Sequence, residues 1–298
     1  MQQRTVVLPF PIDVRGTLTG LRRGPHDPSC RFGDDGIWRA SRSPAGPATV
    51  RLVLDGDRVE ASAWGEGAEA ALDAVPNLIG IHDDDEGFDP RHPLVARLWR
   101  DFGDRRIPRS GAVTESLVSS VLEQRVTTFE ARRAQQQLVA RWGEPAPGPT
   151  DLLLPPDPEV LAGVAYYDLH VLGVERKRAD TVRRVAANAR RLDALAALPP
   201  AEAHERLLHT MGVGPWTAAM VALVALGDPD AVPVGDAHIP ADVTHVLTGV
   251  AQDDDDALLE ALEPFAGQRG RVVSLIVAAG LHAPRHGPRY APRDLRDQ

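Results

Sequence analysis

The chain has 298 residues, of which 43% are hydrophobic and 25% charged, with a formal net charge of −9 at pH 7. This is the composition of a soluble globular protein long enough for two or three packed units. Its single cysteine, Cys30, excludes both a disulfide and a four-cysteine iron–sulfur cluster within one chain.

The first 90 residues are rich in strand patterns. Apolar residues alternate with polar ones over 50–54 and again over 59–63, and Asp55-Gly56 between them is typical of a hairpin turn. Residues 66–74 predict one helix laid on the resulting sheet. We therefore expect an antiparallel α+β domain at 1–90. Further short strands are predicted at 16–21 and 38–41.

The acidic run Asp83-Asp84-Asp85 follows His82 at the exit from this domain. An acidic run beside a histidine can bind a cation, but such runs are more often solvated. We expect a solvated connection here.

Helical periodicity replaces the strand pattern after Pro93. The predicted body is all-α over 91–284, a bundle in which small residues let the helices approach closely around a central groove. Residues 285–298 form a basic tail. The expected helices lie at 94–98, 113–122, 131–142, 176–195, the segment after Pro200, 237–247 and 272–279.

Residues 207–217, LLHTMGVGPWT, have the features of a glycine-bracketed hairpin between two helices. Gly212 and Gly214 can take positive φ and bring bare backbone close to a ligand, and Pro215 suits the first turn of the next helix. The amides around Val213 to Trp216 are then unpaired at the positive end of a helix dipole, which is a phosphate-binding arrangement. From the hairpin alone, an ordinary helix-turn-helix with a glycine cap is an equally good interpretation.

The hairpin, the apolar helix after it and the loop that ends in Val234-Gly235-Asp236 together resemble the helix-hairpin-helix superfamily of DNA N-glycosylases. Within it, the bacterial 3-methyladenine DNA glycosylase II group is the most similar. The resemblance covers most of the chain and is densest from Val113 to Asp236. It implies that the hairpin binds a DNA phosphate and that Asp236 is the catalytic residue. The residues that it assigns to DNA contact are Gly212, Val213, Gly214, Thr217, Gln124 and Arg125.

Asp236 precedes a predicted helix, and an Asp at this place is commonly a helix N-cap. The two roles are compatible, because capping keeps the carboxylate ionised and oriented. Cleavage of the bond between base and sugar develops positive charge at C1′, as in glycoside hydrolysis. An ionised carboxylate beside C1′ stabilises that charge and can orient or deprotonate the attacking water.

The lysine content separates two kinds of glycosylase. The chain contains one lysine, Lys177. Members of the superfamily that also cut the DNA strand use a lysine two residues after Gly-Val-Gly, where this chain has Trp216, so lyase chemistry lacks its nucleophile. We therefore expect a monofunctional glycosylase that excises alkylated purines, which are cationic and leave easily. The alternatives are an inactive helix-hairpin-helix DNA-binding protein and a glycosylase for neutral lesions such as hypoxanthine.

The resemblance also suggests a pocket for a base that has been flipped out of the duplex. Trp216 can stack on an electron-poor base by cation–π attraction, although a tryptophan on a helix is as often part of the core. Met220 stands where the enterobacterial relative has an aromatic pocket residue, so the selectivity of the pocket is open. The expected pocket residues are Trp216, Tyr166, Tyr167, Met220 and His238.

Gln124 and Arg125 fall where the family has a glutamine followed by the side chain that wedges into the gap left by the flipped nucleotide. An arginine can stack its plane on bases and hydrogen-bond the orphaned partner base. A plain phosphate contact and a surface arginine are the other interpretations of Arg125.

The expected partner is damaged double-stranded DNA, bound by a monomer. Arginines form local clusters on an otherwise acidic chain, which predicts a basic groove on an acidic body. No cofactor is expected other than a monovalent cation at the hairpin. No apolar run approaches the length of a membrane span and the N-terminus lacks a signal-peptide pattern, so we expect a cytoplasmic, nucleoid-associated protein and no membrane partner.

Overall fold

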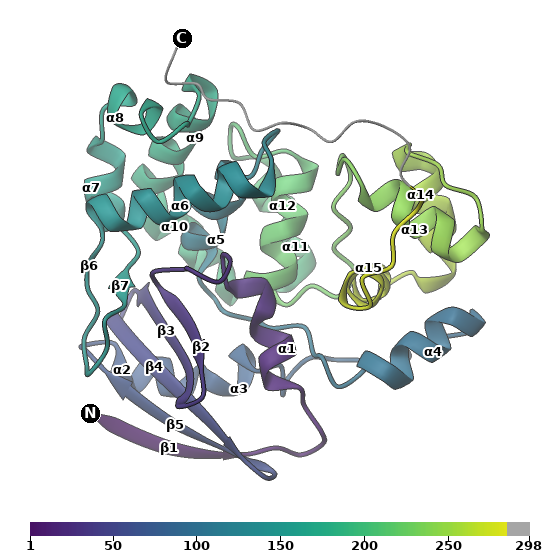
Figure 1. The fold of residues 1–298 in the computed structure, drawn as a ribbon, viewed down its shortest axis with the longest axis horizontal. Coiled ribbons are helices and arrows are strands. Elements are labelled where there is room, and N and C mark those ends of the chain that lie inside the picture. The colour runs from purple at the N-terminus through teal and green to yellow at the C-terminus, as the bar shows by residue number, and fades with distance from the viewer. Residues whose placement is uncertain (285–298) are drawn as a thin grey trace.

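The computed structural model describes residues 1–284, and the predicted basic tail at 285–298 lies outside them. An antiparallel sheet with short helices comes first in the chain, and a larger set of helices follows it (Figure 1). This is the predicted α+β fold class. Across the described residues, no helix is both long and apolar enough to cross a membrane.

All neighbouring strands of the N-terminal sheet run antiparallel, in the order β1-β5-β4-β3-β2. The predicted hairpin is present, because Asp55 pairs with Arg58 across a turn in which Gly56 has a φ of 60°. The strands are β1 (Gln2–Val7), β2 (Cys30–Gly33), β3 (Gly36–Ser43), β4 (Gly46–Asp55) and β5 (Arg58–Trp64).

The segment predicted as a strand at 16–21 is helical instead. It belongs to α1 (Val14–Leu18), which is capped by the carboxylate of Asp13, and to the 3₁₀ turn Thr19–Leu21 that follows. Its buried apolar residues are four and then three positions apart, a spacing that places them on one face of a helix and not of a strand. These residues are Val14, Leu18 and Leu21.

The sheet and its helices share one hydrophobic cluster. α2 (Ala68–Asp73) and α3 (Val75–Leu78) lie behind the sheet in Figure 1 and pack with α1 and the strands. The helix predicted at 66–74 corresponds to α2. Pro76 occupies the first turn of α3, where a missing amide has no cost, so helical structure continues past α2.

The helical part of the chain begins at Pro93. Its helices are α4 (Pro93–Phe102), α5 (Val113–Leu122), α6 (Thr128–Trp142), α7 (Pro158–Gly163), α8 (Tyr166–His170), α9 (Arg176–Ala187), α10 (Ala189–Asp193), α11 (Pro200–Leu208), α12 (Pro215–Val221), α13 (Ile239–Thr248), α14 (Asp255–Leu262) and α15 (Arg269–Ala278). The connection after α6 carries the short paired strands β6 (Glu144–Pro145) and β7 (Leu153–Leu154).

The single helix predicted at 176–195 is divided in two. Asn188 separates α9 from α10, has a φ of −111°, and donates its side-chain amide to the carbonyl of Arg184 at 2.8 Å. A side chain that bonds to the carbonyl four residues earlier competes with the helical backbone. The chain therefore changes direction at Asn188.

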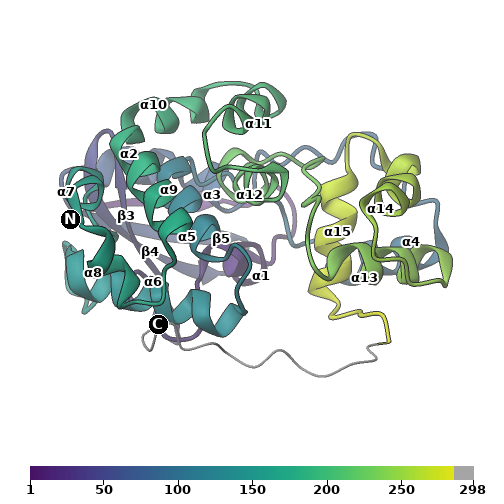
Figure 2. The ribbon, with the colours of Figure 1, turned by 90° about the horizontal axis from the view of Figure 1, so that it is seen from above.

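The helices gather around two separate hydrophobic clusters. Helices from α5 to α12 form the first. The second combines α4 with α13, α14 and α15, so α4 packs against the end of the helical part and not against the helices that follow it in sequence (Figure 2). The chain crosses from the first cluster to the second between Ala231 and Val232. Asp236 lies just after this crossing.

The acidic run at 83–85 is solvated only in part: Asp84 is exposed as expected, but Asp83 is buried in an ion pair. The side chain of Asp83 is 1% exposed and accepts two hydrogen bonds from the guanidinium of Arg271, at 2.7 and 2.8 Å. Arg106 lies 3.3 Å from the same carboxylate, and the amide of Ile107 donates to it at 3.0 Å. This buried ion pair fastens the exit of the sheet domain to α15.

We predict that Asp83→Asn lowers the free energy of unfolding by about 3–5 kcal/mol, because it leaves the buried guanidinium of Arg271 without its charge partner, whereas Arg106 keeps Asp85 at 2.7 Å. Urea denaturation measures the change. Asp84→Asn is the matched control, since Asp84 is exposed and its replacement should change stability by less than about 0.5 kcal/mol. Equal losses in the two variants would show that the ion pair does not hold the fold together.

Candidate functional site

The loop between α12 and α13 carries Asp236 and is anchored at its start. A π-helical segment, Ala222–Leu226, extends α12 and ends at Gly227, which has a φ of 70°. Asp230 then accepts hydrogen bonds from the backbone amide and from Nε of Arg269, at 3.0 and 2.8 Å. Partial burial raises the pKa of Asp230, but the hydrogen bonds and charge of Arg269 outweigh it and hold that pKa below its ordinary value. An ionised Asp230 thus fixes the loop to the start of α15.

The end of the loop is also fixed. Gly235 has a φ of 88°, a conformation that favours glycine, and its amide donates to the carboxylate of Asp255 at 2.9 Å. Asp255 begins α14, so part of the acidic stretch 253–256 serves to hold the turn in front of Asp236.

The carboxylate of Asp236 is held by three N–H donors. One oxygen, Oδ1, accepts from the amides of His238 and Ile239 at 2.8 and 3.0 Å. The predicted N-cap role is not met, because α13 begins at Ile239 with His238 as its N-cap, and Asp236 instead holds the turn just before the helix. The other oxygen, Oδ2, accepts from Nε1 of Trp216 at 2.8 Å. With both oxygens engaged, the carboxylate has a fixed direction. Asp236 is half-buried and therefore remains open to a ligand.

Trp216 has a role that the sequence did not suggest. It lies in the first turn of α12, is half-buried, and reaches across the boundary between the two hydrophobic clusters to Asp236. The sequence predicted either a ring that stacks on the flipped base or a residue of the hydrophobic core. The hydrogen bond to Asp236 joins residues 20 positions apart in sequence, and no local pattern indicates such a contact.

The hairpin differs in detail from its prediction. Gly212 has a φ of 92° and lies so close to Thr181 that a Cβ there would be 2.3 Å from its hydroxyl oxygen. Gly214 instead is extended, with a φ of −96°, so one of the two glycines and not both uses positive φ. Val213 is buried and its amide donates to Thr210 at 2.9 Å, so that amide is not free. α12 begins at Pro215, with Gly214 as its N-cap and no side-chain cap. The predicted phosphate-binding amides are therefore limited to the first turn of α12.

Gln124 and Thr217 bind each other. Nε2 of Gln124 donates to Oγ1 of Thr217 at 2.8 Å and to the carbonyl of Gly212 at 3.1 Å. Thr217 is 2% exposed, so its side chain supports the hairpin from inside and does not present a surface for DNA. The structure brings these predicted DNA contacts together, but as partners of one another.

Arg125 is exposed on the turn between α5 and α6. Its φ is 55°, and it is the sole residue other than glycine with positive φ among residues 1–284. A side chain rarely adopts this conformation unless its surroundings impose it, and such residues gather at functional sites.

The predicted pocket residues fall into two groups. Met220 is half-buried one turn after Trp216 on α12, and His238 is exposed beside Asp236, so both lie at the site. Tyr166 and Tyr167 lie on α8, on the opposite side of the helical part from α13 in both Figures 1 and 2. β6, β7 and α7 place the segment between α6 and α9 on the side away from α13. The two tyrosines therefore take no part in the site around Asp236.

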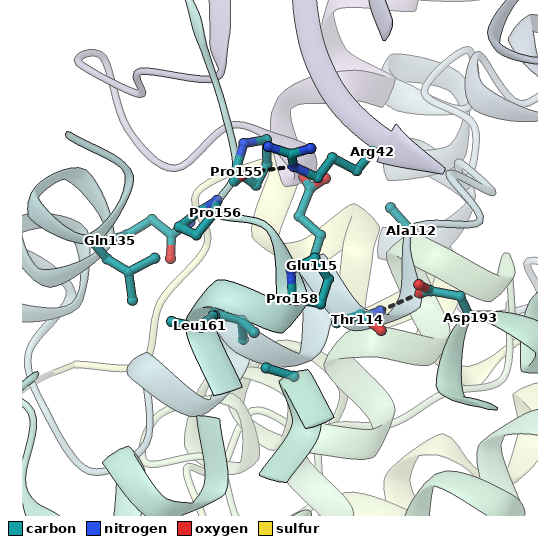
Figure 3. A pocket seen from close by; sticks show the side chains of 13 residues that line it. Arg42, Ala112, Thr114, Glu115, Gln135, Pro155, Pro156, Pro158, Leu161 and Asp193 are labelled. Atoms are coloured by element: carbon teal, nitrogen blue, oxygen red, sulfur yellow. Dashed lines mark hydrogen bonds between the residues drawn. The ribbon is translucent and has the colours of Figure 1, made fainter. Parts of the chain in front are cut away.

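A cavity of about 50 Å³ lies elsewhere, between β3, α5, α6 and α7 (Figure 3). Buried side-chain oxygens of Glu115 and Gln135 face it, and neither oxygen has a hydrogen-bond partner in the described part of the chain. Burial raises the pKa of Glu115. The space fits a few water molecules, which polar cavities of this size ordinarily hold. None of its lining residues comes from the loop that carries Asp236.

No model of a known protein family matches the chain. The chain is 31% identical over 221 residues to the probable bifunctional transcriptional activator/DNA repair enzyme AlkA of Mycobacterium tuberculosis. The alignment covers 70% of this chain and 44% of that protein, so the chain spans less than half the length of this relative.

Two solved structures share the fold over almost the whole chain. The 3-methyladenine DNA glycosylase of Archaeoglobus fulgidus has a TM-score of 0.76 at 18% identity and covers 92% of this chain and 97% of its own. The 8-oxoguanine glycosylase/lyase of Clostridium acetobutylicum has a TM-score of 0.70 at 16% identity, with 93% and 96% covered. The sequence motif, the relative and the fold agree: the chain is similar in sequence to a DNA repair enzyme and has the fold of these DNA glycosylases.

Proposed function

We propose that the chain is a monofunctional DNA glycosylase, which flips an alkylated purine out of double-stranded DNA and hydrolyses its N-glycosidic bond. The observation that carries this proposal is the carboxylate of Asp236, half-buried and held by three N–H donors in the loop that follows α12. The two backbone donors alone would hold only one of its oxygens. The third donor, Trp216, fixes the second oxygen as well and leaves the carboxylate no freedom to turn away.

Asp236 would act mainly through its charge. Positive charge develops on the deoxyribose as the base departs, and a carboxylate already fixed beside C1′ stabilises it without reorganising. The same carboxylate can orient the attacking water or accept its proton. The amides of His238 and Ile239 at the start of α13 hold the carboxylate in place, and the carboxylate itself supplies the charge.

Hydrolysis is favoured over lyase chemistry by position 216. A lyase needs an amine that attacks the sugar. At position 216 this chain has instead an indole, whose N–H donates to Asp236. The shared fold does not separate the two reactions, because the neighbour from Clostridium acetobutylicum is a glycosylase/lyase. Hydrolysis is therefore favoured by the identity of residue 216, a tryptophan, and not by the fold.

Alkylated purines are the substrate class that the site suits best. A purine methylated on a ring nitrogen is cationic and leaves without a dedicated acid. Near Asp236 stand Trp216 and Met220, which offer an aromatic ring and a polarisable thioether, whereas His238 is exposed. The hairpin would hold a phosphate of the same strand at the first turn of α12, with or without a monovalent cation, and Arg125 would enter the space left by the flipped nucleotide.

Replacing Asp236 by Asn should lower the single-turnover excision rate by about 10²–10⁴-fold, because the charge that stabilises C1′ is lost. Affinity for lesion DNA should change little. The rate is measured as the release of base from a duplex that contains 7-methylguanine. Asp253→Asn, which removes an exposed charge from the acidic stretch at 253–256, is the control.

An Asn side chain also places an NH₂ group near the indole N–H. The double variant Asp236→Asn with Trp216→Phe removes that clash, and we expect it to remain as slow as Asp236→Asn. Recovery of activity in the double variant would mean that geometry, and not charge, was lost.

Trp216→Phe alone keeps an aromatic ring and removes the donor to Asp236. We expect kcat to fall by about 10- to 100-fold, the equivalent of one hydrogen bond to a charged group, with a smaller change in KM. Trp142→Phe, at the end of α6, is the matched control. An unchanged kcat in Trp216→Phe would contradict a role for the indole N–H and leave only ring stacking.

A panel of oligonucleotides with one defined lesion each tests the reaction and the substrate class together. We expect faster excision of 3-methyladenine and 7-methylguanine than of hypoxanthine, and strand breaks only after alkali. Strand cleavage without alkali, or a protein–DNA adduct trapped by borohydride, would refute the absence of lyase activity. Release of no base from any lesion would favour an inactive DNA-binding protein.

A further inference from the structure

We propose that Gln124 is a positioning residue that locks the turn carrying Arg125 to the hairpin, so that the two elements that meet DNA act as one rigid unit. The inference rests on the proposed function, because it gives Arg125 and the hairpin their tasks on DNA. It assigns Gln124 to the protein's own scaffold, whereas the sequence resemblance assigned it to DNA.

The turn at 123–127 needs external support. Arg125 occupies it with a φ of 55°, in the left-handed region that residues with a Cβ avoid. Such a conformation persists where neighbouring contacts impose it. The turn must therefore be held by its surroundings, and the structure shows three hydrogen-bonded holds in addition to an ion pair of Glu123 with Arg23 at 3.5 Å.

Two of the holds fasten the turn at its ends. Arg178 is 3% exposed and donates to the carbonyl of Leu122 at 2.9 Å, which fixes the end of α5. Thr127 and Glu130 form a reciprocal capping box at the start of α6. Neither hold reaches the hairpin.

Gln124 is the hold that connects the turn to the hairpin. Its side-chain amide donates to the carbonyl of Gly212 and to the hydroxyl of Thr217, at 3.1 and 2.8 Å. A carbonyl accepts and cannot donate, so the NH₂ end of the amide must face the hairpin. Both of its N–H groups are then engaged within the protein, and a contact with DNA through them would break this link.

The link continues toward the catalytic carboxylate. Thr217 is buried on α12 directly after Trp216, and Trp216 donates to Asp236. α5 also packs against α12. A single short helix thus carries both contacts, with Gln124 on one side and Asp236 on the other. The residue that enters DNA, Arg125, the hairpin that binds the phosphate and the carboxylate of Asp236 are therefore held in fixed positions relative to one another.

The experiment is a double-mutant cycle on base flipping. Gln124→Ala removes the donor, and Thr217→Val removes the buried hydroxyl while keeping the shape of the side chain. Flipping is measured by the fluorescence of 2-aminopurine beside the lesion. We expect each single variant to lower the flipping equilibrium constant by about 3- to 10-fold, the range of one ordinary hydrogen bond. The double variant should be no worse than Gln124→Ala, because both changes break the same link.

Thr217→Ser is the conservative control, since it keeps the hydroxyl, and it should flip the base nearly as well as the wild type. It also tests the link by itself if Gln124→Ala folds poorly. Normal flipping in Thr217→Val together with a defect in Gln124→Ala would overturn the proposal and point to a direct contact of Gln124 with DNA. Additive losses in the double variant would overturn it as well.

Excision by the wild-type protein is measured on the same duplexes. A wild type that flips the base without releasing it, with a non-additive cycle, would contradict the proposed function but support the role of Gln124. A wild type that releases the base, with an additive cycle, would contradict only the role of Gln124.

Discussion

The hydrogen bond from the indole of Trp216 to the carboxylate of Asp236 is the contact on which the site depends. It spans the boundary between two hydrophobic clusters, one formed by α5 to α12 and the other by α4 and the last three helices. Without it, the carboxylate would be fixed by the second cluster alone, through the amides of His238 and Ile239 at the start of α13. With it, the hairpin and the carboxylate have a defined distance from each other, which a reaction at one deoxyribose of a bound strand requires.

The rest of the molecule limits movement around this contact. Asp230 with Arg269 and Gly235 with Asp255 fix the two ends of the loop before Asp236. Farther away, the buried pair of Asp83 with Arg271 ties the sheet domain to α15, the helix on which that loop is anchored. Several acidic residues of this chain thus hold backbone in place, and a net charge of −9 says little about the surface that meets DNA.

Much of the fold could be predicted because the signals were local. The hairpin at Asp55-Gly56, the helices from Val113 onward and the glycine-bracketed hairpin each have a turn residue or a periodicity that acts within a few positions. The exceptions have physical reasons. Residues 16–21 are too short for alternation to separate strand from helix, and the division of α9 from α10 depends on where one asparagine side chain turns.

The site was predictable in its parts but not in its contacts. Asp236 and the hairpin were found from a motif, whereas the pairing of Trp216 with Asp236 and of Gln124 with Thr217 joins positions 20 and 93 residues apart. Tyr166 and Tyr167 were predicted at the site but lie on α8, away from it. The sequence does not indicate on which side of a helical bundle an aromatic residue lies. The burial of Thr217 likewise follows from tertiary packing alone.

The central claim is that a fixed negative charge lies where the sugar becomes positive. The most direct test is the affinity for a duplex in which a cationic pyrrolidine replaces the target deoxyribose, compared with a duplex that carries a neutral tetrahydrofuran at the same place. The account predicts that the protein binds the cationic duplex at least about tenfold more tightly, and that Asp236→Asn abolishes the preference. Equal affinity of the wild type for the two duplexes would contradict it.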